Sequence, residues 1–411
     1  MNRVVITGMG AITPIGNTVE EFWNGIKEKK CGIDEITLFD TTNYKAKLAG
    51  EVKNFNPDDY LDKKAARRLD RFCQFAMVAT NELMNDSKLD VSKIDATRFG
   101  VIVGSGIGGL RTVSDGVNTI REKGPDRVSA FFIPMTISNM AAGNISIAVG
   151  AKGESFDITT ACSSGTHSIG EAYRLIKHGY QDVIIAGGAE AAIVEAGMAA
   201  FTNMKALSLS TDKNRASIPF DKERTGFVMG EGAGLVLLEE LEHAKKRKAK
   251  IYAELVGFGS TSDSYHITAP SPDGEGATRA MKLAMEDAKI KPEDIEYINA
   301  HGTSTPLNDL GETMAVKSAF GEASKKVMMS SIKGNIGHLL GAAGSTEAIA
   351  TIKAIETGIV PPTINYKVPD EECDLDIVPN EPRKANINYA MSNSLGFGGH
   401  NGCLIFKKYE E

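Results

Sequence analysis

Cys162 lies in a stretch whose residue types fit nucleophilic chemistry. Residues 154–179 read as a strand, a sharp turn and an amphipathic helix with apolar Ile169, Ala172 and Leu175. This order predicts Cys162 at the start of the helix, where unpaired N–H groups and the helix dipole favour an anion and lower a thiol pKa. A free cysteine is equally often a small buried apolar residue. Position alone leaves both interpretations open.

Two histidines and a glycine-rich turn supply the groups that a nucleophilic cysteine needs for proton handling and oxyanion stabilisation. His301 ends the strand-like run "YINAH", and His338 lies in "SSIKGNIGHLLGAAG", which also contains Lys333. The glycines around Phe397 predict a hairpin whose backbone can approach a ligand closely and donate an amide. Each feature alone is more often structural, but together with Cys162 they predict one catalytic site.

Other residues of the same types lack such surroundings, and we assign them structural roles. They are His167, His178, His243, His266, Cys31, Cys73, Cys373 and Cys403. "GSGIGGL" contains a shifted GxGxxG motif, but a dinucleotide site would need a single βαβ unit with an acidic residue on the next strand. We therefore expect no nucleotide cofactor there.

The overall composition excludes several classes of protein. A net charge of −7 argues against general nucleic-acid binding. We see no secretory signal and no apolar run long enough to span a membrane. The five cysteines are scattered and odd in number, which argues against a disulfide framework or a zinc site and favours a cytoplasmic location.

Short apolar runs alternate with amphipathic helical stretches, which predicts an α/β fold whose strands are buried on both faces. The pattern restarts after the basic run at 243–251, where "IYAELVGFGS" parallels "RVVITGMGAI". We therefore expect two halves of similar topology, residues 1–250 carrying the cysteine and residues 251–411 carrying the two histidines.

The ordered motifs "VVITGMGAITPIG", "DITTACSSG", "NAHGTSTPLND", "KGNIGHLLGAAG" and "NSLGFGGHN" strongly resemble the beta-ketoacyl-acyl-carrier-protein synthases over nearly the whole chain. The resemblance implies the thiolase fold, with two similar βαβαβαββ halves in an α-β-α-β-α arrangement, usually as a homodimer. It also implies decarboxylative Claisen condensation of an acyl thioester with malonyl-carrier protein, which elongates fatty acids by two carbons. His338 matches the elongating enzymes, because initiating relatives have asparagine there.

The resemblance assigns roles residue by residue. Cys162 matches the acyl-accepting nucleophile, His301 and His338 match the decarboxylation pair, and Lys333 matches the lysine that supports the second histidine. The N–H groups of Cys162 and Phe397 match the oxyanion hole, and Phe397 also matches a gating residue. Substrate contacts are implied for Thr303 and Thr305 at the pantetheine arm and for Ile107 and Phe201 at the acyl pocket. No cofactor or catalytic metal is implied; a monovalent cation near Asn299, Glu347 and Ser394 is a further option.

The cationic cluster Lys63, Lys64, Arg67 and Arg68 is either a solvated helix face or, by the resemblance, a docking site for acidic carrier protein. His400 stands where several relatives have threonine and is not counted as catalytic. Two alternatives remain open. One is a non-catalytic partner subunit, against which the intact Cys162 argues. The other is a thiolase, which would need a second reactive cysteine near the C-terminus, where Cys403 lies beyond the matching turn.

Overall fold

A ten-stranded sheet dominates the computed structural model, which describes residues 1–410. Its strand order is β5-β4-β6-β7-β1-β8-β14-β13-β9-β10, and two small pairs, β2–β3 and β11–β12, lie outside it. The strands are β1 (Val4–Ile12), β2 (Asp34–Glu35), β3 (Leu48–Ala49), β4 (Phe99–Gly104), β5 (Ser155–Phe156), β6 (Val183–Glu190), β7 (Gly232–Glu240), β8 (Ala253–Ser262), β9 (Tyr297–Asn299), β10 (Met328–Ser330), β11 (Ile359–Val360), β12 (Arg383–Lys384), β13 (Tyr389–Gly396) and β14 (His400–Lys407).

Fourteen helices accompany these strands within the described residues. They are α1 (Val19–Lys27), α2 (Lys63–Ala66), α3 (Arg71–Ser87), α4 (Leu110–Lys123), α5 (Phe132–Thr136), α6 (Met140–Val149), α7 (Ser164–Lys177), α8 (Glu195–Asn203), α9 (Lys213–Ala216), α10 (Leu241–Lys246), α11 (Glu275–Ala288), α12 (Pro306–Phe320), α13 (Lys333–Ile336) and α14 (Ala343–Thr357). None of the helices in this part of the chain has the length and apolarity needed to cross a membrane.

The sheet consists of two five-stranded parts with the same topology. Numbered in chain order within each part, the strands β1, β4–β7 and the strands β8–β10, β13, β14 both follow the order 3-2-4-5-1. The two parts meet where Val4–Ile6 of β1 pairs antiparallel with Ala253–Leu255 of β8. The chain therefore builds the same supersecondary unit twice.

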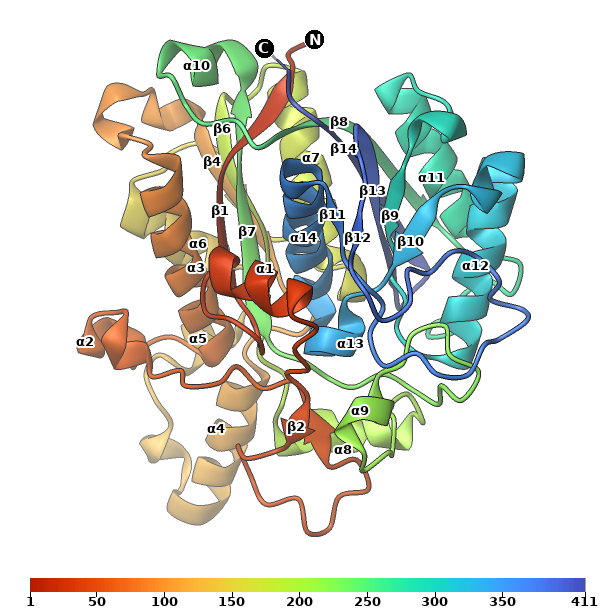
Figure 1. Ribbon diagram of the computed structural model, residues 1–411. Helices are drawn as coiled ribbons and strands as arrows, with labels where there is room; N and C mark the ends of the chain where they lie inside the picture. The colour runs from red at the N-terminus through yellow and green to blue at the C-terminus, as the bar shows by residue number, and fades with distance from the viewer. Residues whose placement is uncertain (411) are drawn as a thin grey trace.

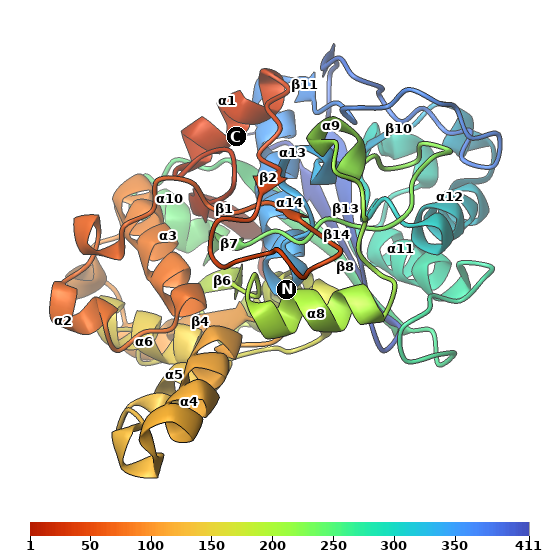
Figure 2. The ribbon, with the colours of Figure 1, turned by 90° about the horizontal axis from the view of Figure 1, so that it is seen from below.

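Helices cover both faces of each part and give five layers (Figure 1). Helices α7 and α14 lie between the two parts, α3 and α6 cover the outer face of the first, and α11 and α12 cover the outer face of the second (Figures 1 and 2). The central core joins Ile169 and Ile176 of α7 with Ile349 and Ile352 of α14, all fully buried. Each such side chain contributes about 1.5–3 kcal/mol. The predicted α-β-α-β-α arrangement is confirmed.

The apolar runs explain these elements. Strands β1, β4 and β6 are buried at every residue, as expected for strands covered on both faces. Thr18 caps α1 by accepting a hydrogen bond from the N–H of Glu21, and the glycine turn at 397–399 closes the predicted hairpin β13–β14. The strand expected before Cys162 is short, because β5 pairs with β4 over two residues only. The chain then leaves the sheet to form the turn that carries Cys162.

Candidate active site

Cys162 sits on a strained turn between β5 and α7. Ala161 has a φ of 51°, in the left-handed region that non-glycine residues rarely adopt. A single 3-10 turn, η5 (Ala161–Ser163), then leads into α7 at Ser164. The predicted position at the start of a helix is confirmed, and the sharp turn exposes 8% of Cys162 in an otherwise buried region.

The second half of the chain contains a matching turn beside His338. Leu340 has a φ of 48°, a 3-10 turn η8 (Leu340–Ala342) follows, and α14 begins at Ala343. Gly341 therefore occupies the position that Cys162 has in the first turn. The two turns pack against each other, and η8 also packs on β6 while η5 packs on β13. This duplication brings the cysteine and His338 together from residues far apart in the chain.

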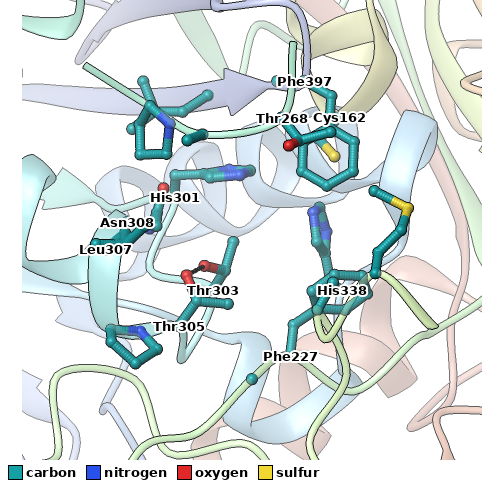
Figure 3. Close-up of a pocket in the computed structure, with 18 of the residues that line it drawn as sticks. Cys162, Phe227, Thr268, His301, Thr303, Thr305, Leu307, Asn308, His338 and Phe397 are labelled. Carbon is teal, nitrogen blue, oxygen red and sulfur yellow. Dashed lines mark hydrogen bonds between the residues drawn. The ribbon is translucent and has the colours of Figure 1, made fainter. Parts of the chain in front are cut away.

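The two predicted histidines face each other next to Cys162 (Figure 3). Their ring centroids are 5.2 Å apart, with the planes at 84°. The backbone N–H of Leu340 donates to Nδ1 of His338 at 3.3 Å. Nδ1 must therefore be unprotonated, which places the ring proton on Nε2. His301 presents an Nδ1 that lacks a hydrogen-bond partner among the described residues.

Three buried charged groups position these rings. The ammonium of Lys333, 1% exposed, contacts both the carbonyl oxygen of His301 and the carboxylate of Glu347. Glu312 on α12 accepts the N–H groups of His301 and Gly302, each at 2.8 Å. Burial, and then the charge of Lys333, lower the pKa of both histidines well below its ordinary value. Both imidazoles are therefore neutral at physiological pH.

The thiol of Cys162 behaves differently from the prediction. Burial raises its pKa to about 12, although Lys333 and the backbone N–H of Phe397 act in the opposite direction. The expectation that the helix start would lower this pKa is wrong for the resting site, because desolvation by the surrounding cavity outweighs the helix dipole. The side chain of Cys162 is therefore a neutral thiol in the resting site.

Hydrogen bonds fix the turn around Cys162 to the hairpin that carries Phe397. Ser163 Oγ donates to the carbonyl oxygen of His400 at 2.8 Å. His167 bridges Thr160 Oγ1, at 2.7 Å from its Nδ1, and the carbonyl oxygen of Asn401, at 3.2 Å from its Nε2. Neither residue lines the cavity, His167 being expected to have a structural role and His400 not being counted as catalytic.

The candidate residues line one cavity of about 590 Å³. Its wall includes the predicted residues Cys162, Phe201, His301, Thr303, Thr305, His338 and Phe397. Thr303 and Thr305 are joined through their hydroxyls at 2.9 Å, and the rings of Phe201 and Phe397 lie 6.3 Å apart. Ile107 does not line this cavity: it is 40% exposed on the loop after β4.

Sequence reasoning missed several residues of the site. Phe227 packs edge-on against the ring of His338, at 5.1 Å between centroids, and Glu312 and Glu347 hold the backbone of His301 and the side chain of Lys333. Phe227 lies in "TGFVMGEG", a glycine-bordered run that could have marked it as a loop residue. Glu312 lies on a helix without any distinguishing local pattern, and Glu347, which the family resemblance places only beside a cation, was not predicted to contact Lys333.

The four basic side chains of the predicted docking cluster are exposed. Lys63 and Lys64 lie on α2, and Arg67 and Arg68 follow it. Lys63 pairs with Asp58 at 3.2 Å, and the guanidinium of Arg68 stacks on Phe131 at 4.6 Å. Figures 1 and 2 both place α2 on the opposite side of the molecule from α12, which borders the cavity.

Known proteins share this architecture over the entire chain. Two solved structures are similar to this one. The first is a type II polyketide ketosynthase in complex with its acyl-carrier protein, and the second is a beta-ketoacyl synthase from Burkholderia phymatum. Their TM-scores are 0.93 and 0.92, with 34% and 36% sequence identity. Alignment covers 99% and 100% of this chain, respectively, and 100% of both structures. The fold is that of the thiolase-fold ketosynthases.

Sequence relationships define the family more narrowly. Residues 1–244 match the beta-ketoacyl synthase N-terminal domain, and residues 252–367 match the C-terminal domain. A 3-oxoacyl-[acyl-carrier-protein] synthase 2 of Staphylococcus aureus is 54% identical over 408 residues, 99% of each chain. One from Synechocystis is 52% identical over 409 residues, 99% of this chain and 98% of its own. The chain belongs to the beta-ketoacyl synthase family.

Proposed function

We propose that this chain elongates fatty acids by joining an acyl group held on Cys162 to malonyl-acyl-carrier protein with loss of CO2. The observation that carries the proposal is the convergence of Cys162, His301 and His338 on one cavity next to the Phe397 amide. The 52–54% identical relatives named 3-oxoacyl-[acyl-carrier-protein] synthase 2 support the same substrates. The direct test is the fate of acyl and malonyl substrates when Cys162 is replaced by alanine.

In the first half-reaction the sulfur of Cys162 attacks the thioester carbonyl of acyl-carrier protein. The N–H groups of Cys162 and Phe397 donate to the oxygen as it becomes negative. The bond to the carrier's sulfur then breaks, and the thiol proton of Cys162 ends on the departing carrier thiol. The neighbouring Lys333 charge and Phe397 amide favour the thiolate during this step.

In the second half-reaction malonyl-carrier protein loses CO2 and leaves an enolate. The Leu340–Nδ1 hydrogen bond leaves the Nε2–H of His338 available to donate to the thioester oxygen of that enolate, and the ring of His301 lies next to it. Neutral imidazoles suit this task, since they donate without neutralising the carbanion. The carbanion attacks the acyl thioester, the bond to Cys162 breaks, and one proton taken up from solvent converts the released thiolate to the thiol.

We expect the cluster Lys63, Lys64, Arg67 and Arg68 to bind carrier protein, because its exposed positive charge complements an acidic partner. Changing Lys64, Arg67 and Arg68 together to glutamate should raise the KM for carrier-bound substrates about tenfold and leave kinetics with small acyl thioesters unchanged. The control reverses three exposed lysines beside or on α10, Lys245, Lys246 and Lys248. An equal effect on both kinds of substrate, or the same effect from the control, would remove the docking role.

We also propose a homodimer formed through the segment 107–156. Strand β5 ends the sheet with its outer side unpaired by the described chain, and an edge strand of this kind is a template for pairing with a second copy. Exposed apolar side chains surround it, at Ile107, Val117, Ile120, Phe131, Ile133, Ile137, Ile147 and Phe156.

Sedimentation of the wild type at micromolar concentration should give a mass of twice 43.9 kDa. Ile133→Glu should lower that mass and Leu283→Glu should not; a monomeric wild type contradicts the proposal.

The division near residue 250 is proposed as the boundary between the duplicated halves. The repeated strand order and the family matches ending at 244 and starting at 252 support it.

Five unpaired cysteines within the described chain fit a reducing cytoplasm, where we place the reaction. The buried oxygens Asn299 Oδ1 and Glu347 Oε2, which lack partners among residues 1–410, fit the cation that the family resemblance implies nearby.

A further inference from the structure

Glu190 is a fully buried carboxylate that takes no part in the proposed reaction. It ends β6, is 0% exposed and does not line the cavity. One oxygen accepts the N–H groups of Gly106, at 2.7 Å, and Gly341, at 3.0 Å. The other accepts the hydroxyl of Ser105 at 3.0 Å. Burial raises the pKa of Glu190 to about 7, and these donors favour its ionised form.

The partners of Glu190 lie on the His338 turn, at Gly341, and on the loop after β4, at Ser105 and Gly106. Gly341 is the residue of the His338 turn that corresponds to Cys162 in the other turn. Ser105 connects to the Cys162 turn, because Thr159 Oγ1 donates to its carbonyl oxygen at 3.1 Å. A series of hydrogen bonds through Thr159, Ser105, Glu190 and Gly341 therefore connects one turn to the other.

The backbone is closely packed around these hydrogen bonds. A Cβ atom on Gly341 would lie 2.2 Å from the backbone nitrogen of Gly106, and one on Gly106 would lie 2.7 Å from Glu190 Oε2. Without the carboxylate, the N–H group of Gly341 would be buried and unpaired and that of Gly106 would lose its partner, so the turn would have to move to find new partners.

We propose that Glu190 is a positioning residue, whose carboxylate holds the His338 turn in its place next to the Cys162 turn. The inference rests on the proposed function, since it assigns decarboxylation to the histidines and acyl transfer to the cysteine. A misplacement of about 1 Å at a reacting group can cost about 100-fold. Loss of Glu190 should therefore impair the step that uses His338 and spare the step that uses the Cys162 and Phe397 amides.

The test measures the two half-reactions separately. Transfer of a labelled acyl group from acyl-carrier protein is measured on Glu190→Ala, and CO2 release from malonyl-carrier protein is measured on Glu190→Ala in a Cys162→Ala background. We expect CO2 release to fall about 10- to 100-fold and acyl transfer to change less than threefold. Glu190→Gln, which keeps an oxygen for the two N–H groups, should restore most of the CO2 release.

Two further variants keep the test decisive. Glu82→Gln is the matched control, because Glu82 also accepts two backbone N–H groups, those of Ala11 and Val19 at 2.8 Å, and burial raises its pKa to about 7. If Glu190→Ala does not fold, Glu190→Asp retains the charge with a shorter reach and should show the same split. Equal loss of both half-reactions, or loss of neither, overturns the inference. A Cys162→Ala chain that releases no CO2 and a wild type that accepts no acyl group overturn the proposed function itself.

Discussion

Replacing Cys162 with alanine should abolish formation of beta-ketoacyl product while release of CO2 from malonyl-carrier protein continues. Alanine keeps the turn and its backbone N–H but removes the sulfur that holds the acyl group. Loss of a covalent nucleophile lowers turnover by about 1,000-fold or more. Decarboxylation needs only the two histidines, whose backbone and side-chain contacts do not involve the sulfur. Chromatographic detection of the product and trapping of labelled CO2 measure the two outcomes.

Cys403→Ala is the matched control for this experiment. Cys403 is fully buried in β14, does not line the cavity, and has a pKa that burial raises far above its ordinary value. A thiolase would need a second reactive cysteine, so loss of condensation in Cys403→Ala would favour that reaction over the proposed one. Continued condensation by Cys162→Ala would contradict the covalent role of Cys162.

The sequence was sufficient to predict residues that the folded chain brings to one cavity, because each sits at a local signal. Cys162 follows an apolar run and opens a helix, while His301, His338 and Phe397 lie in glycine-bordered loops at strand ends. The fold class followed from the same alternation of buried strands and helices. Local patterns are reliable here because the turns are short and the strands continuously apolar.

The groups that tune the site could not be predicted, because their roles arise only in the folded chain. Glu190 meets Gly341 across 151 residues, and Glu312 meets the backbone N–H of His301 across 11. The pKa of Cys162 illustrates the same limit. Its helix position favours the thiolate, but desolvation by the surrounding cavity reverses the direction of the shift.

The duplication explains why the two parts of the site fit together. Strained residues at Ala161 and Leu340 begin equivalent turns, and both turns start helices of the central layer. Because α7 and α14 pack side by side between the two parts of the sheet, their N-terminal turns meet at one place. One half places Cys162 there and the other half places His338, so neither half forms the site alone.

Replacing His338 with alanine should lower CO2 release from malonyl-carrier protein about 100- to 1,000-fold, the cost of losing one preorganised donor to a developing oxyanion. Acyl transfer to Cys162 should change far less, since its oxyanion donors are backbone amides. His178→Ala is the control, because His178 is exposed at the far end of α7. Equal losses in both half-reactions would contradict a role of His338 specific to the enolate.

The pH dependence of CO2 release provides an independent check on His301 and His338. Burial and the Lys333 charge lower the pKa of both imidazoles, so the neutral forms persist as pH falls through 6.5, the ordinary value for histidine. The rate should therefore stay level through that pH and decline only well below it. Lys333→Met removes a charge that disfavours protonation, which raises both pKa values and moves the acidic decline to higher pH. An unchanged profile in this variant would show that Lys333 does not keep the histidines neutral.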